Sequence, residues 1–185
     1  MIILITGASH TGKTLLARMM LDRLKYPYLS IDHLKMGLIR SGNTGLTPED
    51  DDELTEYLWP IVREMIRTAA ENRQDLTVEG CYIPFDWRAD LQDLSPDSIS
   101  FVCLVMTDRY IDSSFDKIVD HESDIEHRFR DTGCTAEGLK EDNRNFAEGF
   151  ARSGERIVLI DSDFEGTLQS VADTLYSQIK GHIRP

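Results

Sequence analysis

The sequence predicts an α/β fold with a parallel sheet, because short apolar runs alternate with segments of helical periodicity. Its 185 residues fit one domain. A hydrophobic content of 41% and a charged content of 29% are ordinary for a globular chain. The chain has no internal repeat, no low-complexity stretch and no long linker. We therefore expect one domain over residues 1–185.

Five apolar runs have the length and composition of strands. They are Ile2–Thr6, Tyr28–Ile31, Leu76–Glu79, Ile99–Val105 and Arg156–Ile160. Helices are expected at Lys13–Leu24, His33–Arg40, Asp108–Val119 and Glu165–Ile179.

Two further regions are less regular. Residues 48–72 are helical in pattern, with Thr47 as the expected N-cap and Pro48 as the first helical residue. A break is expected near Trp59 and Pro60, since proline interrupts a helix. The region from Asp120 to Gly154 is polar, with weak helical character.

Charge and composition exclude several classes of function. The formal net charge of −13 argues against a nucleic-acid partner, because such proteins usually carry a basic surface. No apolar run has the length of a membrane span. Met1 is followed directly by the apolar Ile2–Ile5 without a basic segment, which indicates a first strand and not a signal peptide. We expect a cytoplasmic protein without a membrane partner.

Cysteine and histidine give no metal or disulfide signal. Cys81, Cys103 and Cys134 are far apart and form no paired motif. His121 and His127 are six residues apart, which fits no common ligand spacing.

One motif carries specific chemistry. Residues 7–14 match G-x-x-x-x-G-K-[ST] in full, with Gly7, Ala8, Ser9, His10, Thr11, Gly12, Lys13 and Thr14. The motif follows an apolar strand and opens a helix, as a phosphate-binding loop requires. The two glycines let backbone N–H groups turn inward at a helix N-terminus, which forms an anion cradle. Lys13 is expected to reach the β- and γ-phosphates of a nucleotide, and Thr14 to offer its hydroxyl to Mg²⁺.

The loop alone does not separate kinases from GTPases and ATPases. An N-K-x-D guanine motif is absent, and the D-x-x-G string at Asp163–Gly166 is interpreted as the capped start of the last helix. Asp161 follows an apolar strand, as the Mg²⁺-binding aspartate of a motor ATPase would. The ATPase alternative therefore stays open.

Carboxylates follow two of the other predicted strands. Asp32 comes directly after Tyr28–Ile31, and Glu79-Gly80 ends the third strand. Ligands of open parallel sheets bind beyond the carboxyl ends of the strands. Asp32 could accept a proton from an attacking hydroxyl or hold Mg²⁺, and it could also be a simple helix cap. Glu79 and Gly80 could contact the substrate, or Glu79 could only anchor a loop.

These residues together resemble the small-molecule P-loop kinases. The resemblance rests on Gly7–Thr14, Ile31-Asp32 with Arg40, Val78-Glu79-Gly80 and Ile160-Asp161. It includes adenylate kinase-like, shikimate and gluconate kinase-like, zeta-toxin-like and chloramphenicol phosphotransferase-like enzymes. The run Thr77–Pro84 is similar to the third-strand region of 2-phosphoglycerate kinase-like proteins. Adenylate kinase-like enzymes have Asp-Gly in place of Glu79-Gly80, which argues against a nucleoside monophosphate as acceptor.

The resemblance implies a five-stranded parallel sheet in the order 2-3-1-4-5. It implies a core at 1–32, 76–119 and 155–185, a substrate region at about 33–75 and a lid at about 120–135. Arg128 and Arg130 occupy the place of the lid arginines, which clamp phosphates with their planar guanidinium groups. Arg109 would assist at the nucleotide, and Arg40 could bind an anionic acceptor or pair with an acidic neighbour.

The sequence thus predicts an ATP- and Mg²⁺-dependent phosphotransferase that acts on a small metabolite. Lys13, Asp32, Arg128 and Arg130 are the expected catalytic residues, with Asp32, Arg40, Glu79 and Gly80 at the acceptor. The alternatives are a partner-regulated ATPase or nucleotide-dependent switch, and a nucleotide sensor without turnover.

Overall fold

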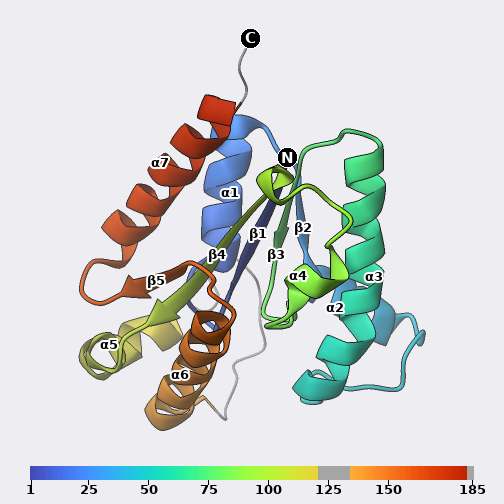
Figure 1. Cartoon of the computed structure of the whole chain (residues 1–185). Coiled ribbons are helices and arrows are strands. Elements are labelled where there is room, and N and C mark those ends of the chain that lie inside the picture. The colour runs from blue at the N-terminus through green and yellow to red at the C-terminus, as the bar shows by residue number, and fades with distance from the viewer. Residues whose placement is uncertain (121–133, 183–185) are drawn as a thin grey trace.

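The computed structural model describes residues 1–120 and 134–182. Its centre is a five-stranded sheet in the order β2-β3-β1-β4-β5, and every neighbouring pair is parallel. The strands are β1 (Ile2–Gly7), β2 (Tyr28–Ser30), β3 (Leu76–Glu79), β4 (Ile99–Met106) and β5 (Ile157–Ile160). This confirms the predicted fold class and strand order. The central β1 therefore lies between β3 and β4, and its carboxyl end leads into the glycine-rich loop (Figure 1).

Helices bury both faces of the sheet, so β1 is apolar at every core position. Ile2 and Leu4 pack on one face, with α3 (Asp51–Glu71) and α4 (Trp87–Asp90). Ile3 and Ile5 pack on the other face, with α1 (Lys13–Leu24) and α7 (Phe164–His182). A parallel sheet covered on both sides requires such a continuous apolar run. Figure 1 shows α1 beside α7 and, across the sheet, the long α3.

Three further helices lie near the carboxyl ends of the strands. They are α2 (Ile31–Arg40), α5 (Asp108–Asp120) and α6 (Ala136–Arg152). A short 3₁₀ turn, Pro96–Ser98, precedes β4. In Figure 1 the starts of α2, α3 and α6 gather toward the end of the sheet where β1 and β4 terminate.

The expected break at Pro60 is wrong, because α3 continues through that residue. Proline removes one backbone hydrogen bond and crowds the preceding turn. However, Pro60 faces solvent, while Leu58 and Val62 on either side of it are fully buried. Burial of the apolar stripe on both sides outweighs the local cost of the proline.

The expected start of α3 is also wrong, by three residues. The helix begins at Asp51, and Asp50 precedes it as the capping residue. Thr47 instead donates its backbone N–H and its hydroxyl to the Asp50 carboxylate, at 2.7 and 3.0 Å. The Thr-Pro pair therefore forms a turn closed by Asp50 and does not open the helix.

The polar region contains a stronger helix than its pattern indicates. Thr135 caps α6 by accepting a hydrogen bond from the Gly138 N–H at 3.1 Å. Only Leu139 and Phe150 are large, buried apolar residues of this helix. Between them the buried Asn143 receives the Met106 N–H at 2.6 Å and donates to the Leu139 carbonyl. A polar residue thus packs α6 onto β4, which weakens the apolar pattern in the sequence.

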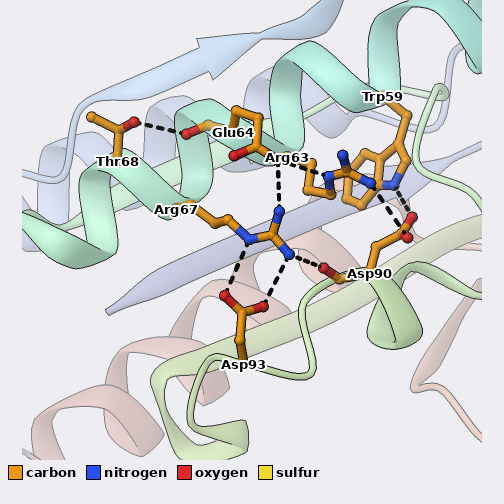
Figure 2. A network of polar contacts seen from close by, with 7 residues as sticks. All are labelled: Trp59, Arg63, Glu64, Arg67, Thr68, Asp90 and Asp93. Carbon is orange, nitrogen blue, oxygen red and sulfur yellow. Dashed lines mark hydrogen bonds and ion pairs between the residues drawn. The ribbon is translucent and has the colours of Figure 1, made fainter.

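A polar network fastens the segment after β3 to α3 (Figure 2). The Trp59 indole donates to the Asp90 carboxylate at 2.7 Å. The Arg67 guanidinium binds both carboxylate oxygens of Asp93 at 3.1 Å and the Asp90 carbonyl at 2.7 Å. These contacts hold α4 against the middle of α3.

Among the described residues, no helix combines the length and apolarity that a bilayer span requires.

Candidate active site

The loop at residues 7–12 is built by backbone conformations that glycine supplies. Gly7 has φ 142°, and a Cβ there would lie 2.0 Å from the Leu104 carbonyl oxygen of β4. Gly12 has φ 86°, and its Cβ would lie 2.7 Å from the Phe164 ring at the start of α7. His10 adopts the left-handed region with φ 63°. The loop therefore fits tightly between β4 and α7, and side chains at the two glycine positions would fill the space it uses.

The Ala8 carbonyl organises the interior of this loop. The Thr11 hydroxyl donates to it at 2.8 Å, and the Lys13 ammonium donates to it at 2.7 Å. Lys13 is the first residue of α1 and is only 8% exposed. The structure thus brings all eight predicted residues, 7–14, into one loop. Thr11 serves the loop itself, while Ser9 and Thr14 are partly exposed.

The two predicted carboxylates lie at the carboxyl ends of neighbouring strands. Glu79 pairs in register with Ile5 of β1 on one side and with Ser30 of β2 on the other. Its side chain is fully buried. Asp32 lies in the first turn of α2, and its carboxylate oxygen is 3.0 Å from the Lys35 ammonium. Glu79 therefore lies on the strand beside β1, which delivers the loop, and Asp32 follows the next strand out, β2, at the same edge of the sheet.

Charged groups from several segments surround the Cys81 thiol and influence its pKa. Its pKa is raised to about 11, mainly by burial and also by the nearby carboxylates of Asp32 and Asp51. The ammonium groups of Lys13 and Lys35 act in the opposite direction. The lysine of the loop, the acid of α2 and the first residue of α3 therefore all influence the same thiol. These groups lie at the carboxyl edge of the sheet, although they come from separate segments.

Sequence reasoning missed three residues that interact at this edge of the sheet: Lys35, Asp51 and Tyr82. The Lys35 ammonium donates to the Tyr82 hydroxyl at 2.7 Å, and this hydroxyl donates to the Asp51 carboxylate at 2.7 Å. Burial raises the pKa of Tyr82, and the neighbouring Cys81 and Asp51 raise it further. The only sequence signal was the i, i+3 spacing of Asp32 and Lys35 on a helix.

Asp142 of α6 is a further acid whose surroundings include Asp51. Burial raises the pKa of the Asp142 carboxyl, and the Asp51 carboxylate at the start of α3 raises it further.

The predicted arginines are not all part of this cluster. Arg40 lies in the last turn of α2, about 12 Å along the helix axis from Asp32. Arg109 opens α5, is largely exposed and pairs with Asp161. Arg128 and Arg130 lie outside the described residues, as does most of the expected lid. Their roles stay predictions.

Asp161 and Asp163, which would serve an ATPase or a GTPase, both have hydrogen-bond partners in the structure. Asp161 follows the edge strand β5, which is two strands from β1, as β2 is on the other side, and it accepts hydrogen bonds from Thr107 and Arg109. Asp163 accepts the Gly166 N–H at 2.9 Å, so the D-x-x-G string is a helix cap, as expected.

The loop and the carboxylates at this edge of the sheet fit a nucleotide and its magnesium ion. Backbone N–H groups at a helix start and the Lys13 ammonium suit phosphate oxygens. The Thr14 hydroxyl and the Asp32 carboxylate are oxygen ligands of the kind that Mg²⁺ prefers. Within residues 1–120 and 134–182, His, Cys, Asp and Glu form no cluster of three or more that could hold a metal by themselves. This agrees with Mg²⁺ binding through one or two carboxylates together with substrate phosphates.

Comparisons with known proteins place the fold. No protein-family profile matches the sequence, and no curated protein matches it. Solved structures do match over nearly the whole chain. Deoxyadenosine kinase from M. mycoides, determined with dCMP and dCDP, has a TM-score of 0.57 and 13% identity, covering 96% of this chain and 100% of that one.

Two shikimate kinases are similar in the same way. The enzyme from Bacteroides thetaiotaomicron has a TM-score of 0.55 and 15% identity, covering 94% of this chain and 97% of its own. The enzyme from Aquifex aeolicus has a TM-score of 0.53 and 12% identity, covering 98% and 99%. At these identities the likeness concerns the fold. The chain has the three-layer fold of the small-molecule P-loop kinases.

Proposed function

We propose that the protein is an ATP-dependent phosphotransferase that moves the γ-phosphate to a hydroxyl group of a small metabolite. The observation that carries this proposal is the placement of Lys13 and Asp32 at the same carboxyl edge of the parallel sheet, after β1 and β2. A phosphate-binding lysine and a carboxylate at the same edge of the sheet are the two groups that hydroxyl phosphorylation needs. The kinase fold of the chain supports the same reaction class.

ATP would bind with its phosphates on residues 7–14. The loop N–H groups and Lys13 would bind the β- and γ-phosphates, for which Lys13 must exchange its bond to the Ala8 carbonyl. Thr14 would hold Mg²⁺, which neutralises phosphate charge when bound. Of its two predicted roles, Mg²⁺ ligand or base, Asp32 would take that of the base. Arg128 and Arg130 stay predicted phosphate ligands.

In the reaction, the acceptor oxygen forms a bond to the γ-phosphorus. The bond from that phosphorus to the β,γ-bridging oxygen breaks, and ADP leaves with the electron pair. The acceptor proton passes to the Asp32 carboxylate. Lys13 stabilises the charge that develops on the phosphoryl oxygens, where most of the catalysis arises.

Glu79 and Gly80 would support the acceptor side. Glu79 is buried in β3, between β1 and β2, so it would support the acceptor side from within the sheet. Gly80 has φ 155° and lies against Ile31, which lets α2 start close to β3. Arg40 could contribute only to the outer part of an extended acceptor, given its distance from Asp32.

The test is ADP release from Mg·ATP against a panel of hydroxyl-bearing metabolites. We expect one chemical class to stimulate release strongly. Stimulation should be lost in Lys13→Ala, which removes the phosphate-binding ammonium, and in Asp32→Ala, which removes the proton acceptor. A flat panel with slow basal hydrolysis that rises with a partner protein would support the ATPase alternative instead.

A further inference from the structure

A chain of polar contacts links Asp32 to the start of α3. It runs from the Asp32 carboxylate to the Lys35 ammonium (3.0 Å), on to the Tyr82 hydroxyl (2.7 Å), and ends on the Asp51 carboxylate (2.7 Å). The Lys35 ammonium also lies 4.9 Å from the centre of the Tyr82 ring. This polar chain therefore joins three segments: α2, the turn after β3 and α3.

The direction of each hydrogen bond in the polar chain is fixed by its ends. An ammonium group can only donate, and an ionised carboxylate can only accept. The Tyr82 hydroxyl must therefore accept from Lys35 and donate to Asp51. The raised pKa of Tyr82 keeps this hydroxyl protonated. With a charged Lys35 and an ionised Asp51, the two hydrogen bonds of the Tyr82 hydroxyl can have only these directions.

Burial makes the polar chain rigid at its centre. Tyr82 is 2% exposed, and the Lys35 side chain is 12% exposed. A lysine ammonium on a flexible stem loses much rotamer freedom when it is fixed, and here two partners and an aromatic face hold it. Little of its surface is left for a ligand. Its position suits the fixing of other groups better than direct contact with a substrate.

We propose that Lys35 and Tyr82 are positioning residues, which hold the Asp32 carboxylate toward the acceptor and tie its orientation to the start of α3. This inference rests on the proposed function, because it assigns Asp32 to the reacting hydroxyl. Catalytic groups must be held to within a fraction of an ångström and a few tens of degrees of their productive geometry. Asp32 has a rotatable side chain on the first turn of a helix, so an external group must select its rotamer.

The kinetic test uses Lys35→Met and Tyr82→Phe, each of which removes a hydrogen-bonding group and keeps the bulk of the side chain. We expect Lys35→Met to lower kcat at least tenfold, with the KM for ATP changed less than twofold. Tyr82→Phe should lower kcat several-fold. Lys35→Arg keeps the charge and several donors, and it should restore most of the lost rate.

The protein also offers matched controls. Lys140 is 14% exposed and forms an i, i+3 pair with Glu137 at 3.5 Å, as Lys35 does with Asp32. Tyr57 donates its hydroxyl to the Asn43 carbonyl at 3.1 Å, outside the polar chain. Lys140→Met and Tyr57→Phe should therefore leave kcat unchanged.

A double variant tests whether Lys35 and Tyr82 act on kcat together. If the polar chain acts as one unit, Lys35→Met with Tyr82→Phe should lower kcat no further than Lys35→Met alone, because linked residues are not additive. Independent, multiplying losses would overturn the proposal, and so would an unchanged kcat in Lys35→Met. Either result would leave the proposed function intact, since the wild-type protein would still transfer phosphate.

A second measurement does not depend on finding the acceptor. Hydrogen exchange of the backbone amides at residues 54–59 reports how firmly the start of α3 is held. Both Lys35→Met and Tyr82→Phe should accelerate exchange there at least threefold, while Lys140→Met should not. Unchanged exchange in both variants would show that the polar chain does not hold α3 and would overturn the proposal, whatever the metabolite panel shows.

Discussion

Gly80 lies directly against Ile31, and a Cβ at Gly80 would come within 2.8 Å of the Ile31 Cβ. Ile31 is the first residue of α2 and is fully buried, and Asp32 follows it. The glycine at the end of β3 therefore sets how closely α2 can approach the sheet. The position of the proposed catalytic carboxylate depends on the absence of one side chain in another segment.

This contact predicts the effect of Gly80→Ala. The new methyl group meets Ile31 and also occupies a backbone conformation with φ 155°. Backbone strain and overpacking together should lower the free energy of unfolding by about 2–5 kcal/mol. The displaced α2 should also lower phosphate transfer. Urea unfolding and kcat measure the two effects.

Gly42→Ala is the control for strain alone. Gly42 has φ 74°, and no atom lies within 4 Å of the place that a new methyl group would take, so only the backbone strain applies. We expect a loss of about 1–2 kcal/mol and unchanged kcat. Equal losses of stability in the two variants would show that Ile31 does not limit the approach of α2.

The helix cap at Asp163 predicts a loss of stability without a loss of nucleotide affinity. Asp163→Ala removes the acceptor of the Gly166 N–H and should cost about 1 kcal/mol of folding free energy. Thr135→Ala, which removes the cap of α6, should cost a similar amount. The dissociation constant of Mg·ATP should change less than twofold in both. A large rise for Asp163→Ala alone would favour a switch-like role of the D-x-x-G string.

The rate at which the Cys81 thiol is alkylated measures the influence of the charged groups around it. With its pKa raised to about 11 by burial and by Asp32, only about one thiol in a thousand is ionised at pH 8. Alkylation of Cys81 by iodoacetamide, followed by peptide mass spectrometry, should therefore be slow at neutral pH and rise about tenfold per pH unit up to pH 10.

Charge substitutions should move this rate in opposite directions. Asp32→Asn removes a negative charge that disfavours the thiolate, so alkylation should become faster. Lys13→Ala removes a favourable positive charge, so alkylation should become slower. Asp97→Asn, in the 3₁₀ turn before β4, should have no effect. Equal rates in all variants would contradict the placement of both Lys13 and Asp32 near Cys81.

The sheet and the phosphate loop were predictable because their signals are local. The strands are short segments rich in apolar residues, and the loop has four fixed positions within residues 7–14. The continuity of α3 through Pro60 was not predictable, since burial of Leu58 and Val62 against the sheet decides it. Likewise α6 packs through the buried Asn143, which carries no apolar signal.

The candidate site also contains residues that the sequence could predict and residues that it could not. Asp32 and Glu79 could be proposed from their places after strands, because parallel strands end at one edge. The polar chain through Lys35, Tyr82 and Asp51 could not, since Tyr82 is 47 residues from Lys35 and 31 from Asp51. Only the three-dimensional arrangement shows that the separate polar residues share hydrogen bonds.

The most direct test of the account follows the transferred phosphoryl group itself. Protein, Mg²⁺ and ATP labelled with ¹⁸O in the γ-phosphate are incubated with a metabolite extract, and the products are analysed by mass spectrometry. We expect a labelled phosphate ester of one small molecule. It should be absent with Lys13→Ala, and its amount should be much lower with Asp32→Asn. Label found only in inorganic phosphate, at a rate that Asp32→Asn does not change, would contradict it.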